Sequence, residues 1–297
     1  MALAPGAAYG SVALEVGGKA AGLPRRVQPP GYEVTQVAAS GAAPGSAQSA
    51  GRLTPTPVDA DFAFVGPDPL LDWALTLPRR APLAMDGAIQ LLDRNQRVLR
   101  RIEWTQGLPT ELRLPELDAT SKSLFTVGLA WQPEAIRFVR TGAGTVMPGP
   151  VRNKTVLLSN FRVSGMPFDT SGVTRVALPT VRAKFATEST GMQLLPRRRV
   201  AGVDIGEVRL EVSARSADAV RDWVARVAGD GAVTDAERVD FAVELLDATL
   251  KNTVATITLR GCALTGYAEF ELTAAAQTPA NVALRFSVGD LDFKAVA

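Results

Sequence analysis

The sequence predicts a mainly β protein made of two tandem β-sandwich or β-barrel domains, each with one flanking α-helix. Apolar and polar residues alternate over most of the chain, which is typical of strands with one buried face. Only two stretches have a helical spacing, and the segment around the first recurs around the second. With 297 residues, 46% of them hydrophobic, the chain can build two cores. We expect domains at 1–141 and 151–297, joined by a linker at 142–150.

The two predicted helices carry the clearest part of the repeat. Asp68 is placed to cap the first helix, and Pro69 suits its first turn. Ser216 can cap the second helix in the same way. A helix with one apolar stripe needs a sheet or another helix to cover it, so two such helices imply two similar cores. The stripes are Leu70, Trp73, Ala74 and Leu77 in the first helix and Val220, Trp223, Val224 and Val227 in the second, at a constant offset of 150 positions.

A similar strand follows each helix. The segments Ala88–Asp93 and Ala242–Asp247 differ at only two positions, at an offset of 154. The extra residues of the second copy must lie in the connection between helix and strand, where a loop tolerates them. We expect the repeated residues to mark the cores rather than a binding site, because an aromatic residue on an apolar helix stripe usually packs inside. These structural core markers are Trp73, Leu92, Trp223 and Leu246.

The first half reads as strands separated by turns and one long loop. Pro24–Pro30 is rich in proline and predicts a connection, and Gly107–Pro109 should end a strand. Ala38–Pro57 has almost no charge and almost no large apolar side chains, so we expect an extended or mobile loop there. The predicted strands of this half are Tyr9–Val16, Tyr32–Val37, Val58–Val65, Ala88–Asp93, Val98–Trp104 and Leu124–Trp131, with Ile136–Val139 as an extension or a further strand.

The second half repeats this order. Gly142–Pro150 is rich in glycine and proline and is the best candidate for a linker. Gly206 is a possible bulge within a strand at Val203–Val212. The other predicted strands are Val156–Val163, Thr174–Phe185 with an interruption at Pro179, Phe241–Asp247, Val254–Leu264, Tyr267–Thr273 and Val282–Phe293.

Composition excludes several classes of function. The chain has no histidine, which removes the commonest general base and metal ligand and every familiar hydrolase triad. The single cysteine, Cys262, has no cysteine partner and should be a small core residue. The net charge of +2 favours neither nucleic acid nor an anionic membrane. We therefore expect no catalytic residue, no cofactor or metal, no membrane anchor and no sequence-specific nucleic-acid binding, in a protein synthesised in the cytoplasm.

Two pairs of carboxylates leave an alternative open. Asp59 and Asp61 share one face of a strand, as do Glu269 and Glu271. Such pairs can hold a hard cation or flank a glycosidic bond. An enzyme that uses aspartate and glutamate alone, such as a glycosidase, is therefore one hypothesis. We expect instead that they form the wet faces of half-exposed strands.

The order of these segments resembles the tail-tube proteins of contractile phages and of related bacterial contractile injection systems. Val12–Leu23 is similar to the opening strand and glycine turn of that family, and Ala88–Trp104 resembles its hairpin. Phe161–Val163 and Val243–Leu259 are weaker echoes in the second half. Unlike the usual family pattern, this chain contains the tube-like domain twice.

The resemblance implies a structural subunit that forms rings of an inner tube, with other tube, sheath, hub or baseplate proteins as partners in a virion tail or injection particle. Three copies would present six pseudo-equivalent domains. The segment Ala38–Pro57 is then a candidate contact with a neighbouring ring or subunit. An adaptor between tube and baseplate, a tube terminator, and a two-domain binding module of a tail accessory are the alternatives.

Overall fold

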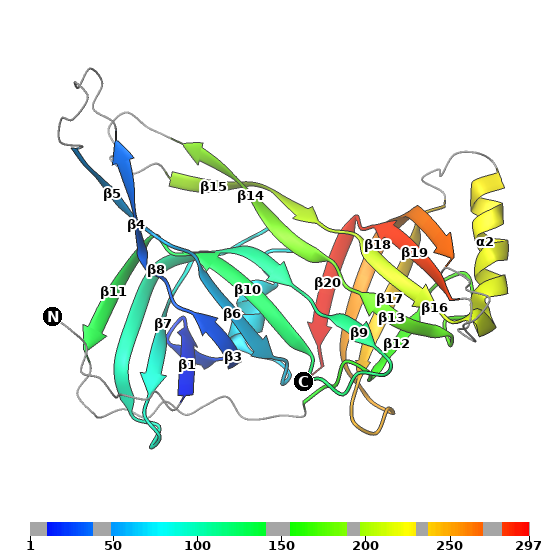
Figure 1. The fold of residues 1–297 in the computed structure, drawn as a ribbon, viewed down its shortest axis with the longest axis horizontal. Helices are drawn as coiled ribbons and strands as arrows, with labels where there is room; N and C mark the ends of the chain where they lie inside the picture. The colour runs from blue at the N-terminus through cyan, green and yellow to red at the C-terminus, as the bar shows by residue number, and fades with distance from the viewer. Residues whose placement is uncertain are drawn as a thin grey trace, which may run out of the picture.

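The computed structural model of the chain describes residues 11–37, 49–140, 155–188, 197–229, 237–269 and 281–296. These residues form a mainly β protein with two large sheets and one α-helix in each half (Figure 1). The predicted fold class is confirmed. The predicted linker at 142–150 lies outside the described residues, and the division into two domains stays a prediction.

The first large sheet contains strands of both halves. Its path runs β2-β1-β7-β8-β10-β6-β3, with β11 and β14 also on β8 and with β15 on β14. The strands are β1 (Ser11–Val16), β2 (Lys19–Ala21), β3 (Leu23–Gln28), β6 (Val58–Ala63), β7 (Met85–Leu92), β8 (Val98–Arg113), β10 (Thr126–Gln132), β11 (Ala135–Arg140), β14 (Thr180–Glu188) and β15 (Arg197–Ile205).

The second large sheet also draws on both halves. Its path runs β12-β17-β18-β19-β16-β13-β9, with β20 on β18. The strands β4 and β5 belong to neither large sheet and form a separate two-stranded hairpin. These strands are β4 (Tyr32–Val37), β5 (Ser49–Pro55), β9 (Glu116–Asp118), β12 (Phe161–Ser164), β13 (Val173–Ala177), β16 (Val208–Val212), β17 (Val239–Leu246), β18 (Thr253–Glu269), β19 (Val282–Ser287) and β20 (Asp290–Ala295).

The strand pairings of the first half recur in the second half. Seven strand pairs of the first half have a counterpart in the second half, in the same order along the chain, and all of them are antiparallel. The repeat predicted from the helices therefore extends through the sheets. The pairs β1–β7, β7–β8, β8–β10, β8–β11, β6–β10, β3–β6 and β4–β5 correspond to β12–β17, β17–β18, β18–β19, β18–β20, β16–β19, β13–β16 and β14–β15.

Both helices bury the apolar stripe that the sequence predicts. In α1 (Pro69–Ala74), Asp68 caps the first turn by accepting from the Leu70 amide at 2.8 Å, and it also accepts from the Gly22 amide at 2.8 Å. Burial raises the pKa of the Asp68 carboxyl although these amides favour its charged form. α2 (Ala217–Gly229) is longer and follows a 3₁₀ turn at Ala214–Ser216. Leu70, Trp73, Ala74, Leu77, Val220, Trp223 and Val227 are buried, and Val224 is half-buried.

The core markers Trp73, Leu92, Trp223 and Leu246 are all buried. Three indoles meet in the first half, with ring centroids 5.5 Å apart for Trp73–Trp131 and 5.2 Å for Trp104–Trp131. In the second half, Trp223 lies 6.1 Å from Phe286 instead. Phe286 pairs with Val208 as Trp131 pairs with Val58, so it fills the position of Trp131 in a second core with fewer indoles.

A change of volume on one strand is matched on its neighbour. Gly87 of β7 pairs with Trp104 of β8, whereas Phe241 of β17 pairs with Leu259 of β18. The indole of Trp104 occupies the space over Gly87, and in the second half the position of Gly87 holds the buried ring of Phe241 instead. The cores therefore keep their volume by exchanging a large and a small residue across the pair.

Several predicted boundaries were wrong because long-range pairing overrides local signals. β8 continues through Gly107–Pro109, where it pairs with β10 beside a register shift, and β18 likewise continues through Gly266. The segment 24–30, predicted as a connection, contributes β3, which pairs with β6. β5 lies within the predicted loop 38–57, because backbone bonds to β4 hold it without a core. Gly206 separates β15 from β16 and is not a bulge inside one strand.

We expect Gly87→Ala to lower the free energy of unfolding by about 3 kcal/mol, since the core there is already filled. A Cβ at this position would lie 2.2 Å from the Glu15 carbonyl oxygen and 2.2 Å from the Trp104 ring. Urea unfolding measures the change. Gly202→Ala is the control: its Cβ would meet nothing within 4 Å, so a change within about 0.5 kcal/mol is expected. Equal stability of the two variants would contradict the packing described for Gly87.

Candidate assembly surface

The two halves are joined by strands that each half contributes to the sheet of the other. β14 of the second half pairs with the end of β8, in the register Thr180↔Arg113, Val181↔Leu112 and Arg182↔Glu111. β9 of the first half pairs with β13. The strands β14 and β15 follow β13 along the chain but belong to the first sheet, and in Figure 1 their hairpin extends over the first half. This head-to-tail joint belongs to neither half alone.

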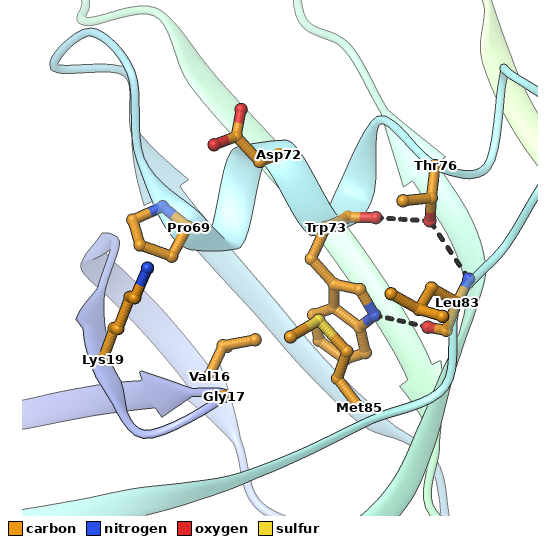
Figure 2. A pocket seen from close by; sticks show the side chains of 9 residues that line it. All are labelled: Val16, Gly17, Lys19, Pro69, Asp72, Trp73, Thr76, Leu83 and Met85. Carbon is orange, nitrogen blue, oxygen red and sulfur yellow. Dashed lines mark hydrogen bonds between the residues drawn. The ribbon is translucent and has the colours of Figure 1, made fainter.

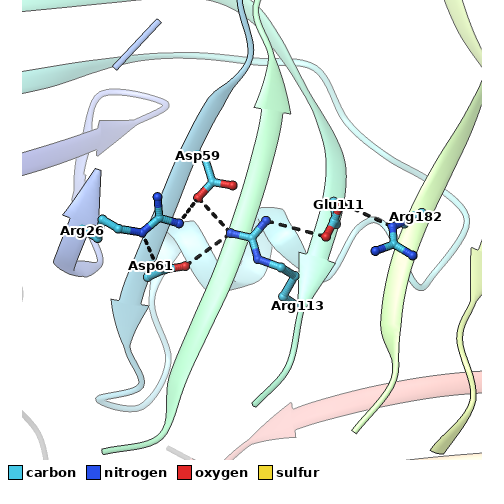
Figure 3. A network of polar contacts seen from close by, with 6 residues as sticks. All are labelled: Arg26, Asp59, Asp61, Glu111, Arg113 and Arg182. Carbon is cyan, nitrogen blue, oxygen red and sulfur yellow. Dashed lines mark hydrogen bonds and ion pairs between the residues drawn. The ribbon is translucent and has the colours of Figure 1, made fainter. Parts of the chain in front are cut away.

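Ion pairs accompany both strand pairings of the joint. Arg182 lies 3.4 Å from Glu111, and Arg175 lies 3.1 Å from Asp118. The first of these pairs ends a row of alternating charges whose side chains come from β3, β6, β8 and β14 (Figure 3). The row consists of Arg26, Asp59, Asp61, Arg113, Glu111 and Arg182.

Asp59 and Asp61, the carboxylate pair left open as a catalytic site, belong to this row. Arg113 lies 2.9 Å from Asp59 and 3.3 Å from Asp61, and Arg26 contacts both carboxylates. Burial disfavours the charge of Asp61, but hydrogen bonds from Arg26 and Arg113 outweigh it and hold its pKa below the ordinary value. Both carboxylates are thus occupied by guanidinium groups, which favours the expected structural role over acid–base chemistry.

The second carboxylate pair is only partly described, because Glu271 lies outside the described residues. Glu269 accepts from Arg221 at 2.9 Å and from the Tyr267 hydroxyl at 2.7 Å. The hydrogen bond from Arg221, followed by that from Tyr267, lowers its pKa. In the part of the chain that the structure describes, no group of three or more His, Cys, Asp or Glu residues is placed to hold a metal ion.

An apolar contact also crosses the joint. Phe293 of β20 is 2% exposed and packs on two rings of the first half, with centroids 5.6 Å from Phe64 and 6.3 Å from Phe125. Its counterpart in the first half is Phe138 of β11, because Phe138 pairs with Ile102 as Phe293 pairs with Ile257. Phe138 is 53% exposed. The same position of the repeat is therefore buried at the joint, where it is Phe293, and exposed at the end of the molecule away from the joint, where it is Phe138.

The hairpin β4–β5 lies at that open end. Tyr32 donates its hydroxyl to the Ile136 carbonyl at 2.7 Å, and its ring meets Phe138 edge-on. Val34 and Leu53 pair across the hairpin, and both are exposed. Among the described residues, β4 pairs only with β5. An apolar hairpin with a free edge is the kind of surface at which another chain adds a strand.

The cleft beside α1 is a weaker candidate for a binding site (Figure 2). Its volume is about 340 Å³, and it is lined by Val16, Gly17, Lys19, Pro69, Asp72, Trp73, Thr76, Leu83 and Met85. The Trp73 indole already donates to the Leu83 carbonyl at 2.7 Å, and the Thr76 hydroxyl donates to the Trp73 carbonyl at 2.6 Å. These polar groups of the cleft walls therefore bond to one another.

No family model matches the sequence, and no curated protein matches it. A chain of the extended sheath–tube complex of the extracellular contractile injection system PVC is 14% identical over 46% of this chain and 88% of that chain, with a TM-score of 0.38. A chain of the tube-terminating cap of the anti-feeding prophage is 10% identical over 46% and 89%, with a TM-score of 0.38. Hcp1 from Flavobacterium johnsoniae is 17% identical over 45% and 95%, with a TM-score of 0.31. These structures come from the class of assembly that the sequence resembles, at a likeness that does not establish a function.

The joint residues were not identified from the sequence. The predicted core markers lie in the cores and take no part in the contacts of the joint described above; they are Trp73, Leu92, Trp223 and Leu246. One signal was present: Phe138 and Phe293 recur at matching places of the repeat. No helix in the described part of the chain is long and apolar enough to span a membrane.

We expect Phe293→Ala to lower the free energy of unfolding by about 3–4 kcal/mol, because it removes a buried ring between the halves. Phe138→Ala is the matched control, since it removes the equivalent but exposed ring and should cost under about 1 kcal/mol in the dilute monomer. Thermal and urea unfolding at low protein concentration compare the two. A similar decrease in the free energy of unfolding for both variants would contradict the burial of Phe293 and the exposure of Phe138.

Proposed function

We propose that this chain is a structural subunit of a phage tail or of a phage-like contractile injection system, and that it forms rings of the inner tube. The observation that carries the proposal is the head-to-tail joint between its two similar halves. A heterologous contact of this kind repeats from one copy to the next, and it closes into a ring when the rotation allows. The resemblance of the sequence to tail-tube proteins supports the same assignment.

The domain boundaries belong to this proposal. The first tube-like domain would comprise residues 1–141 and the second 151–297, with 142–150 between them. Three copies of the chain would then close a ring of six pseudo-equivalent domains. Each copy supplies one joint within the chain and makes one with its neighbour, so a sixfold tube is matched by threefold symmetry.

Other tube, sheath, hub or baseplate proteins are the partners that such a ring would stack against. The chain would be synthesised in the cytoplasm and then assembled into a virion tail or injection particle. A layer that adapts the tube to the baseplate, or one that terminates it, fits the same ring. The role is architectural, and we expect no catalysis and no cofactor.

Negative-stain electron microscopy of the purified full-length chain tests the proposal. We expect closed rings with six lobes, alone or stacked into tubes, and a particle mass of three chains by light scattering. Rings with another number of copies would overturn the threefold arrangement but keep the structural role. A monomer that persists at high protein concentration would overturn the ring and would favour the two-domain binding module, whose exposed Tyr32 and Phe138 would then contact the bound surface.

A further inference from the structure

We propose that β4 of one copy pairs with β18 of the next copy, through Gly31–Glu33 and Gly266–Ala268, in the register that β14 uses on β8. The inference rests on the proposed ring and names the contact that joins its copies. The pairing of β14 with β8 inside the chain is the template. The counterparts of these two strands, β4 and β18, lie at opposite ends of the molecule (Figure 1).

The hydrogen bonds of the two hairpins establish which residues of β4 correspond to β14. The Gly206 amide donates to the Thr180 carbonyl at 2.9 Å, and the Thr56 amide donates to the Gly31 carbonyl at 2.9 Å. Gly31, Tyr32 and Glu33 therefore occupy the positions of Thr180, Val181 and Arg182. Both hairpins rise toward the same side of the molecule in Figure 1, and β14 pairs there with β8 of the first half.

The receiving residues of β18 follow from its pairing with β19. Leu112 of β8 pairs with Leu129, and Tyr267 of β18 pairs with Leu284, the counterpart of Leu129. β17 covers the other side of β18 as far as Cys262. Beyond that point, no described strand covers the side of β18 opposite β19, whereas β14 covers the matching part of β8. Transferring the register places Tyr32 opposite Tyr267 and Glu33 opposite Gly266.

The charges at this pairing are complementary, with their signs reversed relative to the template. Arg182 contacts Glu111 at the joint within the chain. Between copies, Glu33 takes the place of Arg182 and Gly266 takes the place of Glu111. The guanidinium of Arg285 lies 2.7 Å from where a Cβ of Gly266 would stand, so it covers that glycine from the neighbouring strand. Glu33 and Arg285 are both exposed, and neither forms an ion pair with the described residues.

A designed disulfide tests the register. The full-length chain carries both Tyr32→Cys and Tyr267→Cys. In the proposed register, the cysteine at 32 of one copy lies directly opposite the cysteine at 267 of the next, at a distance that allows a disulfide. We expect mild oxidation to convert most of the protein to covalent trimers on a non-reducing gel, with the ladder ending there because the ring is closed. The native thiol does not compete, because burial raises the pKa of Cys262 to about 12.

The matched control is Val34→Cys with Tyr267→Cys, two residues out of register, where the separation of about 7–8 Å prevents the bond. We expect less than a tenth of the cross-linking of the in-register pair. Equal cross-linking of both pairs, or none in either while rings still form, overturns the proposed pairing. The second outcome leaves the ring itself intact, whereas a wild-type chain that forms no rings overturns the ring and the pairing together.

Charge reversal provides a test that does not need new cysteines. We expect Glu33→Arg or Arg285→Glu alone to raise the protein concentration at half-assembly at least fivefold, because each places like charges opposite one another. The double variant restores the pair and should return within about twofold of the wild type. Both side chains are exposed, so folding of the monomer should not change. Additive losses in the double variant would overturn the proposed contact.

Discussion

Backbone pairing along β8 is the constraint on which the rest of the structure depends. β10 and β11 follow one side of this long strand, whereas β7 covers the other side only as far as Gly107. The amides and carbonyls beyond that point need another partner, since an unpaired polar group removed from water costs about 1–3 kcal/mol. β14 supplies it, and the ion pair at Glu111 and the ring contact of Phe293 follow from that placement.

The local part of this structure could be predicted from the sequence, and the long-range part could not. Apolar spacing located both helices and most strands, because burial of one face leaves a periodic pattern. β8 was cut short at Gly107–Pro109, since only its pairing with β10 reveals that the strand continues. The hairpin strand β5 was missed because its alanine, glycine and serine residues bury no core. The joint was missed for a similar reason: Arg182 and Glu111 are ordinary strand residues until the fold brings them together.

The two halves show how far a repeated fold diverges while its pairing stays the same. Trp104 over Gly87 becomes Leu259 beside Phe241, and Trp131 becomes Phe286. The exchange at Gly87 and Trp104 keeps a large residue in the core, whereas the change from Trp131 to Phe286 replaces a ring by a smaller one. Polar positions change more freely: Asp59 and Asp61 of the charged row correspond to Arg209 and Glu211. Strand register is therefore the feature that the halves share, and side-chain identity is secondary to it.

Covalent linkage of the halves has a kinetic consequence. β8 and β14 belong to one chain, so their association is a first-order step whose rate does not depend on protein concentration. An assembly of separate single-domain subunits would need a bimolecular encounter for every joint. In the proposed ring, linking the units in pairs would halve the number of such encounters and would leave the remaining ones as the steps that dilution slows. Control over when the particle begins to form would then lie in the contacts between chains.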